Sequence, residues 1–139
     1  MSKNAYILDA CALIALLAGE PGADKVKNII QDAIDGKAKV KVNQINLLEV
    51  YYYAVNVYNQ DKANKILVKI KKFPIEILVG LDERTFKEAG RIKSTYKIPL
   101  GDSIAAAESI VRKEALVTSD HSDFDKVEVA ENIKICWFR

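Results

Sequence analysis

Short apolar stretches alternate along this chain with longer segments in which apolar residues recur every three or four positions. The short stretches have the composition of buried strands, and the longer segments have the spacing of amphipathic helices. Such alternation predicts βαβ units around a mostly parallel sheet, and we therefore expect an α/β fold. The expected strands cover residues 4–8, 39–43, 75–79, 115–118 and 133–138.

The helical segments between these strands are bounded by residues that favour helix ends. Gly36 is placed to end the second helix, Pro74 to stop the fourth, and Asp82 to cap the fifth. Residues 119–123 have the composition of a turn, and we expect a loop there that contains the only histidine, His121. The helices are expected at residues 11–18, 23–35, 47–58, 61–73, 82–94 and 102–114.

Length and composition are those of one ordinary globular domain. The chain has 139 residues, of which 50% are hydrophobic and 29% are charged, and it contains no repeat or linker. No apolar run approaches the roughly 18 residues of a membrane span, and residues 10–18 lack the basic start of a signal peptide. We therefore expect a single domain over residues 1–139, located in the cytoplasm.

Neither the net charge nor the cysteines identify a ligand. A net charge of +2 is too small to indicate a nucleic-acid partner by itself. Cys11 and Cys136 are far apart and match no zinc or redox spacing, so we expect reduced thiols in the apolar core.

Four acidic residues stand where predicted strands end or predicted helices begin. Asp9 and Asp120 each follow a strand, whereas Glu49 and Asp102 come early in helices. Ligands of parallel sheets bind beyond the carboxyl ends of the strands, so we expect the four side chains to lie together. Close carboxylates raise one another's pKa, and a hard divalent cation relieves the repulsion. The pattern therefore indicates metal-assisted chemistry on a phosphorylated substrate.

Each acid also has a purely structural explanation. Asp9 could be a helix N-cap, and Asn46 and Glu49 have the spacing of a capping box. Asp102 could complement a helix dipole, and Asp120 could be a turn residue. The conjunction favours a shared site, because caps alone would not require these residue types in this order.

The acids are embedded in four stretches with apolar flanks: Tyr-Ile-Leu-Asp9-Ala-Cys, Asn46-Leu-Leu-Glu49-Val-Tyr-Tyr, Leu100-Gly-Asp102-Ser-Ile-Ala-Ala-Ala and Leu116-Val-Thr118-Ser-Asp120-His-Ser-Asp123-Phe. In this order and at these intervals, the stretches resemble the motifs of PIN-domain nucleases. Within that family the chain is most similar to the VapC-type toxins of toxin–antitoxin pairs. The resemblance extends from Asn4 to Arg139.

The resemblance implies a three-layer α/β/α sandwich that holds one or two Mg²⁺ or Mn²⁺ ions and hydrolyses RNA phosphodiesters. By motif, Asp9 and Asp102 would be direct metal ligands. Glu49 would be a ligand or would accept the proton of the attacking water. Asp120 would be the fourth acid and could hold a second ion, and Asp123 is the alternative for that position.

Two residues depart from the pattern of the family, and two more stand beside the acids. Cys11 occupies a position where a small hydroxyl residue is common, and Asn46 replaces Ser or Thr three residues before the acidic Glu. Asn46 can still form hydrogen bonds, so we expect activity to be retained. Thr118 and Ser103 are expected to support the carboxylates rather than to perform chemistry.

Partner proteins are also implied by the resemblance, namely a cognate antitoxin and a second copy of the chain in a homodimer. Three consecutive tyrosines on one helix cannot share a face. We expect Tyr51 in the core and Tyr52 or Tyr53 on a partner surface. An apolar patch around residues 51–58 and 66–70 would suit either contact.

Other functions compatible with the pattern are a catalytically idle PIN-like module that binds protein or RNA, and a receiver-like or phosphatase-like domain with one phosphoacceptor Asp. Four intact acids argue against the idle module. The receiver-like reading lacks a second acid at position 11, which is Cys, and Lys134 lies within the last predicted strand. A small-molecule phosphoesterase would share the metal site with a nuclease.

Overall fold

Five strands form one sheet at the centre of the computed structural model, which describes residues 4–139. They lie in the order β3-β2-β1-β4-β5, and every neighbouring pair is parallel. The prediction of a mostly parallel sheet is confirmed, with strand ends that differ by at most two residues from those expected. The strands are β1 (Asn4–Leu8), β2 (Ala38–Asn43), β3 (Ile75–Leu78), β4 (Ala115–Thr118) and β5 (Ile135–Trp137).

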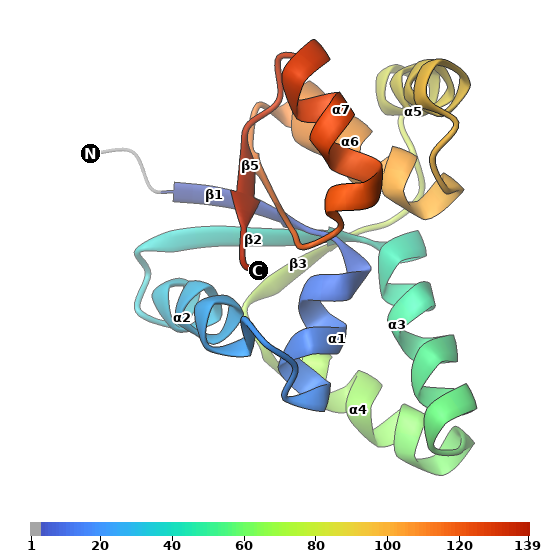
Figure 1. The fold of residues 1–139 in the computed structure, drawn as a ribbon. Coiled ribbons are helices and arrows are strands. Elements are labelled where there is room, and N and C mark those ends of the chain that lie inside the picture. Colours follow the sequence, from blue (N-terminus) through green and yellow to red (C-terminus); the bar gives the residue numbers. More distant parts are fainter. Residues whose placement is uncertain (1–3) are drawn as a thin grey trace.

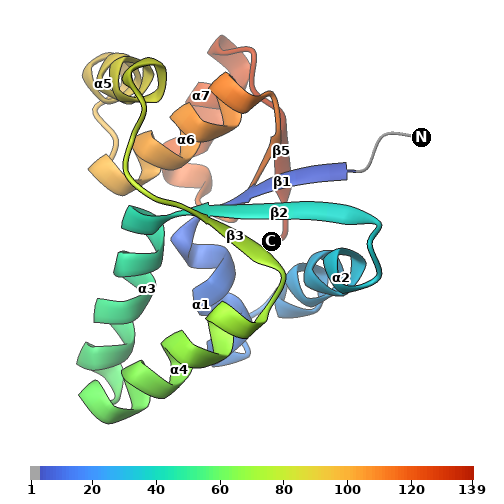
Figure 2. The same ribbon diagram turned by 180° about the vertical axis from the view of Figure 1, so that it is seen from behind.

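Helices cover both faces of the sheet. The lower layer in Figure 1 contains α1 (Ala10–Ala18), α2 (Ala23–Ile34), α3 (Gln44–Val57) and α4 (Gln60–Lys72). The upper layer contains α5 (Glu83–Tyr96), α6 (Leu100–Arg112) and α7 (His121–Ala130). Figure 2 shows the same layers from behind. The predicted three-layer α/β/α sandwich is therefore confirmed.

Successive strand residues alternate between two apolar cores, one on each side of the sheet. Leu8 packs with Leu13 and Val26 in the core between the sheet and the helices α1 and α2. Ile7 packs with Phe124 in the core on the other side of the sheet. Because both faces are covered, β4 is buried at every position. Within residues 4–139, no helix combines the length and the apolarity that crossing a membrane requires.

One expected loop is a helix. The sequence predicts a loop at residues 119–123, but α7 begins at His121, and Asp120 is its N-cap. Ser and Asp favour helix N-termini as well as turns, so composition does not separate the two. The buried side of α7 consists of Phe124 and Val127, which is too little for a clear periodicity. The loop prediction is therefore wrong from His121 onward.

A buried polar network joins α3 to α6. The Glu108 carboxylate of α6 is 2% exposed, and its Oε2 accepts a hydrogen bond of 2.7 Å from Asn43 Nδ2 at the start of α3. Its Oε1 accepts one of 3.1 Å from Arg112 Nε. Removing one partner of such a network would leave a buried group uncompensated, so the network fixes how the two helices meet.

The order of the strands defines where a ligand site is expected. From β1 the chain proceeds to β2 and β3 on one side, and then crosses to β4 and β5 on the other. The carboxyl ends of β1 and β4 therefore flank the point at which the topology reverses, and open α/β sheets bind ligands at such points. Asp9 follows β1 directly, and Thr118 ends β4.

Candidate active site

Asp9 is a buried carboxylate whose two oxygens are both held in place. It is 2% exposed and is the N-cap of α1, where Oδ1 accepts a hydrogen bond of 2.9 Å from the backbone N of Ala10. Oδ2 accepts a hydrogen bond of 3.0 Å from Thr118 Oγ1. The N-cap explanation of Asp9 from sequence is confirmed. Asp9 also lies near enough to Asp102 for its charge to raise the pKa of that residue, so the cap does not exclude a shared site. Thr118 supports a carboxylate, as expected.

Cys11 lies beside Asp9 rather than in wholly apolar surroundings. Its Sγ is 3.5 Å from Asp9 Oδ2 and 3.3 Å from Thr118 Oγ1. Burial and the charge of Asp9 raise the pKa of Cys11 to about 12, so the thiol stays protonated and can donate to the carboxylate. Both cysteines are free, as expected, and Cys136 packs against the core beneath α1 and α2. Cys11 also packs against this core, as predicted, but the contact of its thiol with Asp9 and Thr118 was not expected.

Glu49 projects from α3 toward the start of α6. Asn46 Nδ2 donates to Glu49 Oε1 at 3.1 Å and to the carbonyl oxygen of Gly101 at 3.0 Å. A methyl group at Gly101 would overlap the Glu49 carboxylate, so only glycine permits this approach. The N-cap of α3 is Asn43, so Asn46 and Glu49 do not form the capping box that was the structural alternative for Glu49.

Three further carboxylates converge from α6 and the start of α7. Asp102, Asp120 and Asp123 each place one oxygen within 4.8 Å of the others. Asp120 Oδ1 accepts hydrogen bonds of 2.9 Å from Ser122 Oγ and 3.3 Å from the backbone N of Asp123. Asp120 and Asp123 were alternatives for the fourth acid, and both lie in the cluster. We call these three residues the acidic trio.

The five acids act on one another electrostatically. Burial, followed by the charges of Asp9, Asp120 and Asp123, raises the pKa of Asp102 to about 10. Burial also raises the pKa of Asp9 to about 6, with a contribution from the charge of Glu49. Burial raises the pKa of Glu49. Burial alone would raise the pKa of Asp120 too, but the hydrogen bonds it accepts lower it.

Two buried oxygens at this site have no hydrogen-bond partner. Among the residues described, three buried side-chain oxygens are unpartnered, and two of them are Asn46 Oδ1 and Asp102 Oδ2. Buried polar atoms are normally satisfied, so unpartnered ones require an explanation. Oxygen donors with an excess of negative charge match the ligand preference of Mg²⁺ and Mn²⁺. The residues present therefore fit a hard divalent cation.

The hydroxyl of Ser103 bonds to the backbone rather than to an acid. Its hydroxyl donates to the carbonyl oxygen of Pro99 at 3.0 Å, one turn earlier in the chain. It is fully buried and supports the first turn of α6, which carries Asp102. Its predicted supporting role is thus indirect, through the backbone of the helix.

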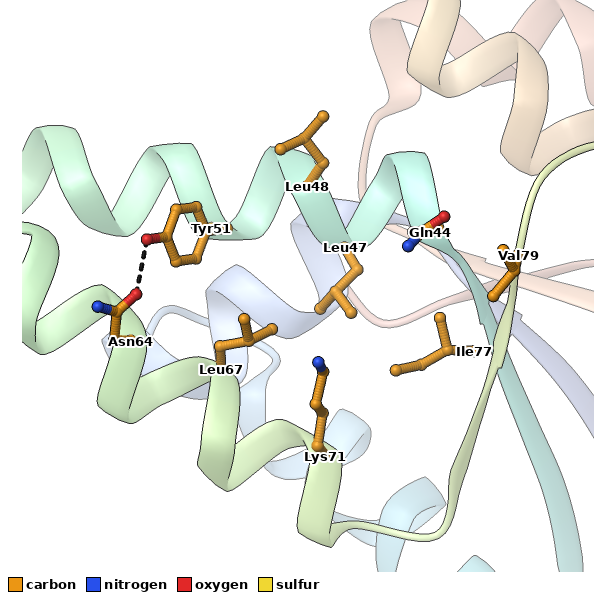
Figure 3. Close-up of a pocket in the computed structure, with 9 residues that line it drawn as sticks. All are labelled: Gln44, Leu47, Leu48, Tyr51, Asn64, Leu67, Lys71, Ile77 and Val79. Atoms are coloured by element: carbon orange, nitrogen blue, oxygen red, sulfur yellow. Dashed lines mark hydrogen bonds between the residues drawn. The ribbon is translucent and has the colours of Figure 1, made fainter.

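A hollow lined mainly by apolar side chains lies elsewhere, between α3, α4 and β3 (Figure 3). It measures about 440 Å³, and none of the five acids lines it. Tyr51, expected in the core, is half-buried at its rim and donates a hydrogen bond of 2.6 Å to Asn64 Oδ1. The residues that line the hollow are Gln44, Leu47, Leu48, Tyr51, Asn64, Leu67, Lys71, Ile77 and Val79.

Solved structures with the same fold include VapBC2 from Rickettsia felis bound to a DNA fragment from its promoter (TM-score 0.75, 16% identity, 96% of this chain and 98% of that chain covered). DNA-bound VapBC from Salmonella typhimurium is also similar (TM-score 0.74, 16% identity, 100% of both chains covered). So is a toxin–antitoxin complex from Klebsiella pneumoniae (TM-score 0.65, 18% identity, 96% and 98% covered). At such identities, these likenesses show the fold alone.

Sequence comparison shows the family. Among curated proteins, none matches this chain. The model of the PIN domain family matches residues 6–130. This range contains all five acids, most of β1, and the strands β2, β3 and β4. The match spans most of the sequence and includes the site described above. The chain therefore belongs to the PIN-domain family.

Proposed function

We propose that this protein is a metal-dependent endoribonuclease that hydrolyses RNA phosphodiesters, and that it is the toxin of a toxin–antitoxin pair in the cytoplasm. The observation that carries the proposal is the acidic trio beside Asp9, with the buried and unpartnered Asp102 Oδ2. Membership of the PIN-domain family supports the nuclease assignment. The similar fold of VapBC complexes supports the assignment as a toxin.

Asp9, Glu49, Asp102, Asp120 and Asp123 would hold one or two Mg²⁺ or Mn²⁺ ions. When bound, such an ion acts as a Lewis acid on phosphate oxygens and makes water a stronger nucleophile near neutral pH. The unpartnered Asp102 Oδ2 is the oxygen most in need of a cation. The Asp9 carboxylate is oriented by the groups that donate to it, which reduces the reorganisation needed on binding.

Glu49 is the residue best placed to accept a proton. It is half-buried, burial raises its pKa, and Asn46 holds one of its oxygens at 3.1 Å. A carboxylate with a raised pKa is a better general base than one at its ordinary value. We assign it either this role or that of a metal ligand.

Partner proteins would dock on the exposed apolar side chains of α3 and α4. Leu48, Tyr52, Val57 and Tyr58 on α3 are 42–52% exposed, and Val68 on α4 is 56% exposed. Exposed apolar patches of this kind mark protein interfaces. We propose that this surface serves a cognate antitoxin or a second copy of the chain in a homodimer.

The proposed activity is tested by incubating the purified chain, free of partner proteins, with a mixture of structured RNAs in Mg²⁺, in Mn²⁺ and in EDTA. Cleavage that requires the ion and disappears in Asp9→Asn would support the nuclease, and mapping the cut would define the substrate. RNA binding without cleavage in all three solutions would instead indicate a non-catalytic PIN-like binding module.

Gly101→Ala is expected to displace Glu49 while leaving the fold intact. The added methyl group overlaps only the far end of a flexible side chain, and Ala is favoured over Gly in a helix by about 0.5–1 kcal/mol. RNA cleavage should fall by about 100-fold, the contribution of a well-placed general base. The measurement is the cleavage rate beside the urea unfolding free energy.

Gly90→Ala is the matched control, because a methyl group at that position of α5 meets nothing within 4 Å. It should match or exceed the stability of the wild type and cleave RNA equally fast. If Gly101→Ala cleaves like Gly90→Ala, the placement of the Glu49 carboxylate does not matter to the reaction.

A further inference from the structure

Arg139 forms hydrogen bonds with the residues on either side of Asp120, namely Ser119 and His121. Arg139 Nη2 donates a hydrogen bond of 3.1 Å to Ser119 Oγ. The carbonyl oxygen of Arg139 accepts one of 2.9 Å from His121 Nε2. Residue 139 thus contacts the residue on either side of an acid of the trio, through its side chain and through its backbone.

The same guanidinium reaches the turn between α1 and α2. Arg139 Nη1 donates to the carbonyl oxygen of Pro21 at 2.9 Å and lies 3.8 Å from Glu20 Oε1. Arg can bridge two acceptors in this way because its donors are fixed in one plane. Arg139 therefore ties the loop before α7 to the turn at the end of α1, on the opposite side of the sheet, and the N-cap of α1 is Asp9.

The residues before Arg139 fix the course of this segment. The ring of Trp137 stacks on that of His121, with centroids 3.8 Å apart and an interplanar angle of 9°. The backbone N of Phe138 donates to the carbonyl oxygen of Thr118 at 3.2 Å. Phe138 also packs so closely on Gly22 that a methyl group there would overlap its backbone. Arg139 is thus presented to Ser119 by a well-supported backbone.

We propose that Arg139 is a positioning residue for Asp120, acting through Ser119. By holding the hydroxyl of Ser119, it keeps the loop between β4 and α7 in the conformation that turns Asp120 toward Asp102 and Asp123. The proposal rests on the proposed function, because it assumes that the acidic trio binds a divalent cation. It assigns Arg139 no contact with the substrate.

The test measures the dissociation constant of Mn²⁺ by titration calorimetry for the wild type, Arg139→Ala, Ser119→Ala and the double variant. We expect each single variant to weaken binding on the order of tenfold, as changes to groups that orient ligands do. The double variant should bind no more weakly than the weaker single variant, because the two changes break the same contact. Arg139→Lys should be intermediate, since an ammonium group keeps the charge but not the planar fork.

Arg91→Ala is the matched control, because Arg91 also bridges two acceptors, Glu88 of α5 and Glu131, but Glu131 is the C-cap of α7, at the other end of that helix from Asp120. It should bind Mn²⁺ like the wild type. Unaltered Mn²⁺ affinity in Arg139→Ala would overturn the inference alone, whereas absence of Mn²⁺ binding in the wild type would overturn the proposed function with it. Should Arg139→Ala not fold, Ser119→Ala decides, and wild-type affinity in that variant would overturn the inference.

RNA kinetics separate positioning from contact with the substrate. Positioning predicts a lower kcat with little change in KM for Arg139→Ala, because the geometry of the acids is altered while the substrate surface is not. A raised KM that depends steeply on salt, with unchanged Mn²⁺ affinity, would show a phosphate contact instead and overturn the assignment.

Discussion

Asp102→Asn is expected to abolish RNA cleavage and, at the same time, to make the metal-free protein more stable. Burial and the neighbouring charge of Asp9 raise the pKa of Asp102 to about 10, so its ionised form is strongly disfavoured in the folded state. An amide is neutral already, so folding no longer requires this group to take up a proton, and it can donate to the Asp120 and Asp123 carboxylates. Together these effects should add about 1–3 kcal/mol to the free energy of unfolding. The loss of a cation ligand should cost about 1000-fold or more in cleavage rate.

Asp61→Asn provides the same chemical change at a position remote from the site. Asp61 lies in the first turn of α4. Figure 1 shows that α4 begins beside the C-terminal end of α3, away from the sheet. Asp61→Asn should cleave RNA at the wild-type rate and lose at most about 1 kcal/mol of stability through the helix dipole. The electrostatic account of the site fails if Asp102→Asn destabilises the metal-free protein, and the functional proposal fails if this variant still cleaves RNA at the wild-type rate.

The sheet could be predicted from sequence because each strand is short and bounded by turn residues or helix caps. β4 and the last two residues of β1, Ile7 and Leu8, are buried on both faces, and their apolar runs indicate this locally. The helix α7 could not be predicted in the same way, because Ser119–Asp123 contains residues that start helices and turns alike. What decides between them is the packing of Phe124 and Val127 in the core between the sheet and the helices α5, α6 and α7, which is a tertiary contact.

Some features of the candidate site could likewise be predicted from sequence, and others could not. Asp9 and Asp120 could be expected near each other because each follows a strand, and parallel strands bring their carboxyl ends to one edge. Glu49 and Asp102 lie in helices, so their positions rest on the resemblance of the motifs. Cys11 meets Thr118 across 107 positions of sequence and Arg139 meets Pro21 across 118, and no local pattern encodes such pairs. Ser103 was expected to support the carboxylates, but its hydroxyl donates to the carbonyl oxygen four residues earlier, as Ser commonly does in helices.

The free energy of unfolding of the metal-free protein is expected to fall as the pH rises from about 4 to about 8. The folded-state pKa of Asp9 is about 6 and that of Asp102 about 10, against an ordinary value of 3.8 for both. Between the ordinary and the folded-state pKa, the folded protein binds more protons than the unfolded chain, so its stability declines with pH. For Asp9 the decline is complete above about pH 6 and amounts to about 3 kcal/mol.

Asp120 contributes in the opposite direction, because its pKa is lowered from the ordinary value of 3.8. The stability that it contributes to the folded protein is lost only as the pH falls through this lowered pKa, below the pH range of the decline. Urea unfolding of the wild type and of Asp102→Asn across this range isolates the contribution of Asp102, which the variant should lack.

Mn²⁺ should offset the decline by about 2.7 kcal/mol at a concentration 100 times its dissociation constant. Because protons compete with the ion for the same carboxylates, this stabilisation should be larger at about pH 8 than at about pH 5. Equal stabilisation at both values would mean that the carboxylates with raised pKa are not the groups that bind the ion, and that the acidic trio owes its proximity to packing alone.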